Sequence, residues 1–185
     1  MYHIKNDKRA RASTELICAG LLACMKEKPF ARITITDVQR ASTVSRSTFY
    51  RNFDCLEDVL ALLCDRGFQA VFSEYNALPP EQRGSLAKAV FQYWFRNSAE
   101  LEALVQIHRT DILFDSLRRS SGLIQALQPM ADDPARFDYF VAIITSSMIG
   151  VLTVWVEHGK TETEDQMVQK LTSAFIEMAI LELPG

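Results

Sequence analysis

The sequence predicts an all-α protein: an N-terminal three-helix head containing a helix-turn-helix, joined to a larger helical body. Apolar residues recur three and four positions apart along most of the 185 residues, which is the spacing of one helix face. No run alternates apolar and polar residues strongly, and no Asn-Gly pair marks a hairpin. Only seven Gly and six Pro are present, which favours long elements. We expect the head to span 1–54 and the body 55–185.

Start and stop signals place the individual helices. In the first helix an apolar stripe from Leu16 to Met25 ends near Pro29. Residues that interrupt or end helices separate the later ones: Pro79, Pro80, Pro129, Pro134 and Gly159. The expected helices are 9–28, 35–42, 46–52, 55–77, 85–97, 100–128 with an internal break, 134–158 and 163–182.

Capping residues support three of these starts. Thr34 stands three residues before Asp37, the spacing of a capping box with an acid as its third helical residue. Ser45 begins the next helix. Asp54, with Glu57 three residues later, is expected to cap the helix at 55–77 in the same way.

The net charge of −3 conceals a split along the chain. Residues 1–53 hold 10 Lys and Arg against 4 Asp and Glu, a net +6. Residues 54–185 hold 10 bases against 19 acids, a net −9. A basic head on an acidic body indicates that the head meets a polyanion and that the body is turned away from it.

Residues 45–52 carry the side chains that a DNA-reading helix needs. With 35–42 they form two short helices joined by a turn of about three residues, as in a helix-turn-helix, whose second helix lies in the major groove. Short hydroxyls reach phosphates or base edges, arginines hold phosphate or guanine, and a tyrosine ring contacts a thymine methyl. The residues concerned are Ser45, Ser47, Thr48, Arg46, Arg51 and Tyr50.

The alternative is a surface helix that merely happens to be basic. Charge alone does not decide against it. Phe49 and Phe53, four residues apart, are expected to face inward with Val38 and Val44. The capped pair of helices, the tight turn, this buried pair and the charge split together favour the DNA-binding interpretation.

The stretch KPFARITITDVQRASTVSRSTFYRNF, residues 28–53, resembles the DNA-binding domain of TetR/AcrR-type transcriptional regulators. The resemblance covers roughly residues 9–65, and YFVAIITSSMIGVLTVWVEHG looks like the penultimate helix of some members. It implies that Thr34 and Thr36, together with Ser45 through Asn52, meet DNA. It also implies a C-terminal homodimer on a palindromic operator and a small-molecule effector.

Two positions depart from the family pattern. Thr43 stands in the turn where glycine is usual, and threonine is poorly suited to a positive φ, so the turn is expected to be altered or strained. Leu56 stands where a lysine often touches phosphate, which puts one phosphate contact in doubt.

Residues 139–156 contain no charge over eighteen positions, close to the minimum for a membrane span. Hydroxyl residues inside the run and flanking acids argue against a span. Small residues four apart favour a close helix contact, and the last helix has an apolar stripe. We therefore expect a four-helix dimer interface that includes Ala142, Ser146, Gly150, Met167, Leu171, Phe175 and Met178, the alternative being that both helices pack within one monomer.

Large side chains between 68 and 128 are core by default, but some are expected to line an effector pocket. The candidates are Tyr75, Phe91, Trp94, His108 and Phe114. His108, Asp111 and Asp115 share a helix face, but without a second histidine the metal interpretation is weak. Pairing of the acids with Arg118 or Arg119 is preferred, and no metal is expected.

The sequence thus predicts a homodimeric, ligand-responsive repressor that binds double-stranded DNA. The alternative is a constitutive DNA-binding dimer whose body recruits a protein partner. No motif of a metalloprotease, nucleotide-binding enzyme or hydrolase is present, so we expect no enzyme and no cofactor. With no signal peptide and four cysteines without CxxC spacing, a cytoplasmic protein with reduced thiols and no membrane association is expected.

Overall fold

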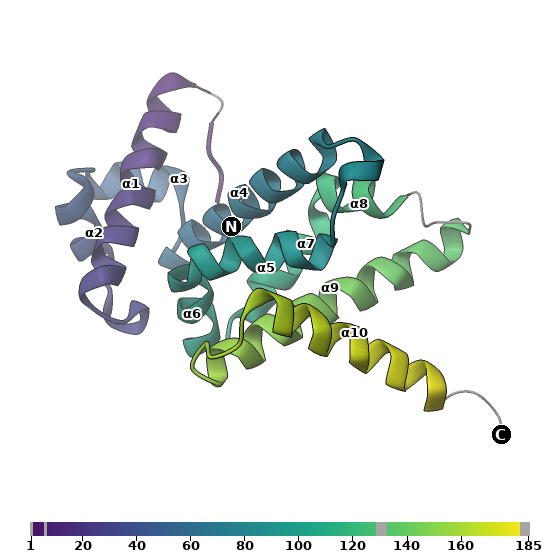
Figure 1. The fold of residues 1–185 in the computed structure, drawn as a ribbon. Coiled ribbons are helices and arrows are strands. Elements are labelled where there is room, and N and C mark those ends of the chain that lie inside the picture. Colours follow the sequence, from purple (N-terminus) through teal and green to yellow (C-terminus); the bar gives the residue numbers. More distant parts are fainter. Residues whose placement is uncertain (1, 6, 129–132, 182–185) are drawn as a thin grey trace.

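The computed structural model describes residues 2–5, 7–128 and 133–181, and its regular elements there are all helices (Figure 1). The head comprises α1 (Lys8–Glu27), the 3-10 helix η1 (Phe30–Arg32), α2 (Ile35–Ser42) and α3 (Arg46–Asn52). The body comprises α4 (Leu56–Ala77), η2 (Pro80–Gln82), α5 (Leu86–Arg96), α6 (Ser98–Gln106), α7 (Thr110–Arg119), α8 (Ser121–Leu127), α9 (Pro134–Glu157) and α10 (Glu164–Leu181). The predicted fold class is confirmed.

The expected break within 100–128 occurs at two points, so this stretch forms three helices. After α6 the chain turns at His108, which has a φ of 56°. The Arg109 N–H donates to the Leu104 carbonyl at 2.8 Å and closes the turn. Ser120, with extended backbone, separates α7 from α8. Histidine is among the residues that tolerate the left-handed region best, which explains a sharp turn without glycine or proline.

The expected cap of α4 is corrected by one residue. Cys55, not Asp54, is the N-cap, and the acid that satisfies the free amides is Asp58 rather than Glu57. Asp58 Oδ2 accepts hydrogen bonds from the N–H groups of Asp54 at 2.9 Å and Cys55 at 3.4 Å. Glu57 and Asp58 are adjacent acids, and each lies three residues after a possible N-cap, so their spacing alone does not decide which acid caps the helix.

The apolar core extends from the body into the head, where the four predicted inward residues Val38, Val44, Phe49 and Phe53 are all buried. The rings of Phe49 and Phe53 lie 5.8 Å apart. Helix α1 approaches α2 very closely at Gly20, where a Cβ would lie 2.8 Å from the Cβ of Ser42. A larger residue there would push α2, and with it α3, away from α1.

The body is organised around α4, the helix that leads from the head into the core (Figure 1). It contacts α5, α6, α7 and α8, while α9 packs on α7 and α10 packs on α5 and α9. The centre of the core is aromatic. Phe68 of α4 stacks on Phe72 and meets the edge of Trp94 at 5.4 Å.

Glu100, the third residue of α6, is buried at 9% exposure. Burial raises the pKa of its carboxyl, while its own backbone N–H opposes that shift. Stability from such a group is fully present below the ordinary glutamate pKa and is lost as the pH rises through the raised pKa. Above the ordinary glutamate pKa, ionisation of Glu100 therefore opposes folding.

We expect Glu100→Gln to stabilise the protein at pH 7, by about 1 kcal/mol, because an amide is cheaper to bury than a carboxylate. Urea unfolding at pH 7 and at a pH below the ordinary glutamate pKa measures the effect. The gain should vanish at the lower pH, and the exposed control Glu81→Gln should show no gain at either. A loss of stability at pH 7 would contradict this account.

Residues 2–5 form a strap from the start of the chain to the body, a feature that sequence reasoning missed. The Tyr2 hydroxyl donates to Asp65 Oδ2 of α4 at 2.5 Å. The His3 N–H donates to the Asn52 carbonyl at the end of α3 at 3.0 Å. Burial and the bond to Asp65 raise the pKa of Tyr2 to about 12, so the hydroxyl remains a donor at neutral pH. The strap thus ties α3 to the body.

The four cysteines are free thiols, and they differ in accessibility. Cys18, Cys24 and Cys64 are buried, whereas Cys55 at the start of α4 is partly exposed. Burial raises the pKa of Cys18 to about 11 and shifts the pKa of Cys64 in the same direction.

Candidate nucleic-acid interface

Helix α2 has the predicted capping box at its start. The Asp37 N–H donates to Thr34 Oγ1 at 3.2 Å, and the Thr34 N–H donates to Asp37 Oδ2 at 2.8 Å. Lys28 from the end of α1 adds an ion pair to Asp37 at 2.7 Å. Hydrogen bonds from Lys28 and Thr34 hold the pKa of the Asp37 carboxyl well below its usual range. Thr34 and Thr36 are both exposed at this capped N-terminus of α2.

The turn between α2 and α3 has a positive φ at Thr43, the conformation to which threonine is poorly suited. Thr43 has φ 57° and ψ 15°, in the left-handed region. Its neighbour Val44 is buried, and the Val44 N–H donates to the hydroxyl of Ser42 at 3.3 Å. A β-branched residue at positive φ is strained, so the structure retains the turn at an energetic cost.

Thr43→Gly is expected to stabilise the protein by about 1 kcal/mol, because glycine accepts this conformation without strain and its greater freedom when unfolded offsets only part of the gain. Chemical denaturation measures the change. Ala19→Gly introduces the same residue at an exposed site within α1 and should destabilise by about 1 kcal/mol. Equal effects of the two substitutions would show that Thr43 is not strained.

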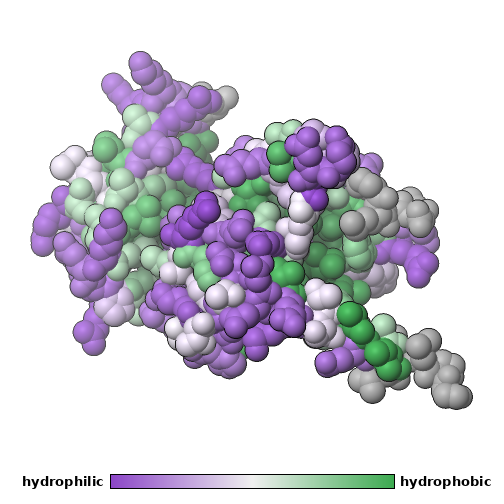
Figure 2. All heavy atoms as spheres, viewed as in Figure 1, coloured by the Kyte–Doolittle hydropathy of each residue, from purple (hydrophilic) through white to green (hydrophobic). Residues whose placement is uncertain are grey.

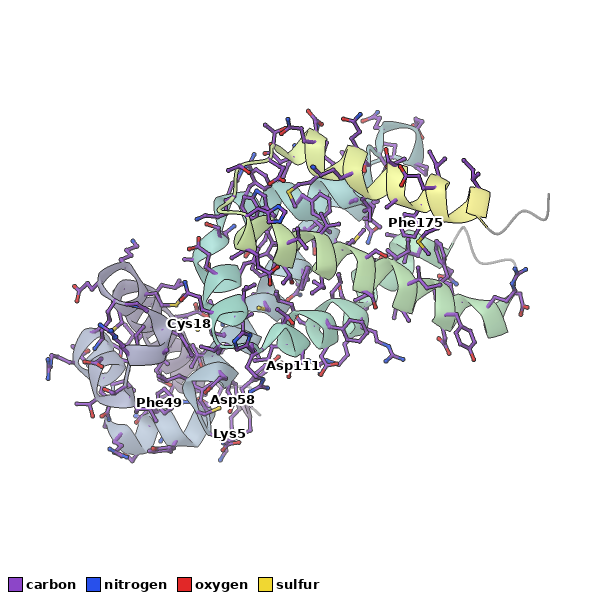
Figure 3. The ribbon with its side chains drawn as sticks, turned by 90° about the horizontal axis from the view of Figure 1, so that it is seen from below. Lys5, Cys18, Phe49, Asp58, Asp111 and Phe175 are labelled. Atoms are coloured by element: carbon purple, nitrogen blue, oxygen red, sulfur yellow. The ribbon has the colours of Figure 1, made fainter. Side chains whose placement is uncertain are left out.

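Helix α3 presents one polar face to solvent. Ser45 caps it, accepting from the Thr48 N–H at 3.2 Å, and Phe49 anchors it in the head core. Figure 3 shows Phe49 within the head. The predicted DNA-binding side chains that this arrangement leaves exposed are Ser45, Arg46, Ser47, Tyr50 and Arg51, with Thr48 partly exposed.

Arg46 and Tyr50 form a pair one helical turn apart. Arg46 Nη2 donates to the Tyr50 hydroxyl at 3.3 Å, and the guanidinium lies 5.4 Å from the centre of the ring. Arg51 Nη2 lies 3.5 Å from Thr48 Oγ1. These contacts hold two long side chains near the surface of α3 before any partner is bound.

Asn52 is a correction to the predicted set. It is 1% exposed, and its side-chain amide donates to the Thr48 carbonyl at 2.8 Å and the Ser13 hydroxyl at 3.4 Å. It therefore links α3 to α1 and does not face outward. Leu56 is also buried, beside a cavity of about 340 Å³ between head and body that Ile107 and Phe30 help to line. Its side chain offers nothing to a phosphate.

The five predicted pocket residues do not converge on one cavity. Phe91 and Trp94 are fully buried in the core, where the ring of Trp94 meets that of Phe68 of α4. His108 is exposed in the turn after α6, and Phe114 is partly exposed on α7. Tyr75 lines a cavity of about 230 Å³ near α5, α8, α9 and α10, in whose lining the other four do not take part.

The polar residues of α7 also differ from the prediction. Asp111 pairs with Arg109 at 2.9 Å rather than with Arg118 or Arg119. Arg119 instead lies 3.8 Å from Asp65 of α4. Among the residues that the structure describes, no three histidine, cysteine or acidic side chains are grouped to hold a metal.

Of the predicted dimer residues, Met167 is a correction, since it is 1% exposed and belongs to the core of its own chain. The others are exposed or partly exposed: Ala142, Ser146, Gly150, Leu171, Phe175 and Met178. Sequence reasoning missed the large apolar residues beside them on α9, although their three- and four-residue spacing was visible. These are Tyr139, Ile143 and Val154, which are 75%, 53% and 46% exposed.

The exposed stripe of α9 continues into a groove against α10. The groove has a volume of about 360 Å³, and Gly150 and Val154 line one side while Ala174, Phe175 and Met178 line the other. Figure 3 shows Phe175 between α10 and α9, and Figure 2 shows apolar side chains along the projecting end of α10. We call the residues Tyr139, Ile143, Gly150, Val154, Ala174 and Met178 the α9–α10 face.

The fold and the site together define a class: a helix-turn-helix head with an acid-free outward face, fused to an all-helical body. Solved structures of this class resemble the chain over nearly its whole length. A TetR transcriptional regulator from Streptococcus agalactiae superposes with a TM-score of 0.61 at 19% identity, covering 91% of this chain and 96% of that one. A TetR-family regulator described as putative, from Syntrophomonas wolfei, gives 0.65 at 19%, covering 94% and 97%.

A third structure, Lin0861 from Listeria innocua, gives a TM-score of 0.72 at 16% identity and covers 95% of this chain and 96% of that one. No family model matches the sequence, and no curated protein matches it. The chain has the fold of the TetR-type transcriptional regulators.

Proposed function

We propose that this protein is a TetR-type, sequence-specific DNA-binding transcriptional regulator that acts as a homodimeric repressor in the cytoplasm. One observation carries the proposal: the outward face of α3 holds Arg46, Tyr50 and Arg51 with small hydroxyls and no acid, on a helix fixed from behind by Phe49. Such a helix fits the major groove, where arginine reads guanine and an aromatic ring contacts thymine.

Separate roles follow from where these side chains lie. Arg46 and Tyr50, already paired, are placed to reach base edges together. Phosphate contacts suit Arg51, which lies further along α3. They also suit the exposed hydroxyls of Thr34 and Thr36 at the start of α2. Ser45, Ser47 and Thr48 are short donors at the N-terminus of α3, the end that enters the groove first.

The α9–α10 face supports a dimer of two identical chains. Large exposed apolar surfaces mark interaction sites, and a two-fold interface pairs the same face of both copies. Helices α9 and α10 from each chain would form a four-helix contact around Gly150, where no neighbouring atom lies within 4 Å of a Cβ position. A dimer would present two α3 helices at about 34 Å, the spacing of successive major-groove faces on a palindromic operator.

Helix α9 contains a segment, Arg136–Glu157, long and apolar enough to cross a membrane. The other side of α9 packs against the body. Met148, Leu152 and Trp155 are buried there, and the helix contacts α5, α6, α7 and α10. We therefore propose that a second copy of the chain, and not lipid, covers the exposed stripe.

Control by a small molecule in the body completes the proposal. A ligand that binds one arrangement of the heads more tightly than another shifts the population by its difference in affinity. The second candidate, a constitutive dimer whose body recruits a protein, is favoured by the burial of Phe91 and Trp94, which places two predicted pocket residues in the core. Weakening of operator binding by a small molecule would decide against it.

Selection of bound sequences from random duplex DNA by the purified full-length protein tests the proposal. We expect a palindrome with half-sites about one helical turn apart. The selected duplex, compared with a scrambled one, should be preferred by about a thousandfold or more at physiological salt. Binding without any enriched motif would count against a sequence-reading role.

A further inference from the structure

A polar groove of about 580 Å³ lies between α4 and the corner where α7 meets α8. Its volume falls within the range of roughly 300–1,000 Å³ found for small-molecule sites. Nine of its twelve lining residues carry polar side chains, among them Asp65, Gln69, Ser73, Asn76, Ser116 and Arg119. An apolar ligand would strip water from these groups without replacing their hydrogen bonds, so the lining selects a polar one.

The groove holds one acid and one base close together. Asp65 Oδ1 lies 3.8 Å from Arg119 Nη2, beyond hydrogen-bonding distance, and also accepts a hydrogen bond from the Ser116 hydroxyl. Arg119 is more than half exposed and is therefore free to reorient. A carboxylate offers about four acceptor positions, so Asp65 has room for a further donor.

We propose that this groove is the effector site and that it takes a small zwitterion of the amino-acid type, with its ammonium group on Asp65 and its carboxylate on Arg119. Such a ligand complements both charges at once, and guanidinium–carboxylate pairs are strong and directional. The role of this ligand in regulation rests on the proposed function; its binding does not.

Asn76 adds a third polar contact point. Its side-chain amide donates to the Gly122 carbonyl at 2.9 Å, while its Oδ1 is buried without a hydrogen-bond partner in the described residues. Gly122 brings α8 directly against α4, since a Cβ there would lie 2.3 Å from Phe72 Cβ. A donor group on the ligand would satisfy the Asn76 oxygen after a small side-chain rotation.

The groove is connected to the DNA-binding head through the strap. Asp65, which would receive the ammonium group, also holds the Tyr2 hydroxyl, and the next residue, His3, holds the end of α3. An ammonium group partly neutralises Asp65 and thereby weakens the hydrogen bond that Asp65 accepts from the Tyr2 hydroxyl. Binding therefore loosens the strap, and by linkage a loosened strap favours binding.

Calorimetric titration of the full-length protein with each proteinogenic L-amino acid, and with neutral sugars as the competing ligand class, tests the assignment. We expect at least one amino acid to bind and no sugar to do so. Asp65→Asn and Arg119→Gln should each weaken binding by about tenfold or more. Tyr2→Phe should tighten it by about threefold to tenfold. Glu74→Gln, an exposed charge on α4 outside the groove, should change nothing.

Each other outcome overturns the proposal. If no amino acid binds at millimolar concentration, or if only sugars bind, the ligand is not a zwitterion of this type. If Asp65→Asn and Arg119→Gln leave the affinity unchanged, the ligand binds elsewhere. If Tyr2→Phe leaves the affinity unchanged, the ligand is not coupled to the strap. DNA selection carried out in parallel distinguishes failure of the ligand site from failure of the proposed function. DNA binding without ligand binding refutes the site alone. Ligand binding without a DNA motif refutes the regulatory role alone.

Discussion

Two charges placed on the α9–α10 face are expected to convert the protein from a dimer to a monomer and to reduce operator binding by about a hundredfold or more. The variant is Ile143→Glu with Met178→Glu, one site on each helix of the face, 53% and 58% exposed in the single chain. Two-fold symmetry places each carboxylate in the interface twice. Burying an unpaired charge costs several kcal/mol per ion, which exceeds what apolar contacts there return.

Sedimentation velocity measures the oligomeric state, and fluorescence anisotropy of a labelled operator measures DNA binding. Gln82→Glu with Gln106→Glu adds the same two charges at exposed positions in η2 and α6 and should leave both readouts unchanged. Circular dichroism checks that the variant keeps its helices. A charged variant that still sediments as a dimer, or a wild-type protein that is a monomer, would refute the proposed interface.

Arg46→Ala and Tyr50→Ala are each expected to weaken operator binding by about 1–3 kcal/mol and to relax the preference for the bases that they contact. Because Arg46 lies 5.4 Å from the Tyr50 ring centre and donates to its hydroxyl, either substitution also releases its partner. The double variant should therefore lose less than the sum of the two single losses.

Arg51→Ala should behave differently, because a phosphate contact carries no sequence information. We expect it to weaken binding to all duplexes alike and to reduce the salt slope by about one. Arg96→Ala removes the same charge from an exposed site at the end of α5 and serves as the control. If all three α3 variants bind as the control does, α3 is not the recognition helix.

Local signals predicted the fold class, most helix boundaries and the outward face of α3. The capping pattern at Thr34 and Asp37 acts within one helical turn, so the sequence contains all the information that it needs. The aromatic residues of the body were beyond such reasoning. Phe91 and Trp94 have the same spacing whether they fill a core or line a cavity, and only tertiary packing, such as that of Trp94 against Phe68, decides between the two.

Asn52 and the strap illustrate two other limits. Asn52 stands three residues after Phe49, so helical periodicity placed it on the inward side, but its polar side chain suggested a DNA contact. Its buried bond to Ser13 joins residues 39 positions apart. The contact of Tyr2 with Asp65 spans 63 positions, and no local pattern predicts that pairing.

The unequal exposure of the four thiols has a practical consequence for spectroscopy. Maleimide dyes react with thiolates, and burial raises the pKa of all four thiols, but it also blocks access to Cys18, Cys24 and Cys64. Cys55, the partly exposed N-cap of α4, stands at the joint between head and body. A fluorophore should therefore attach there in the natural sequence, giving a ready-made site from which to follow movement of the head relative to the body.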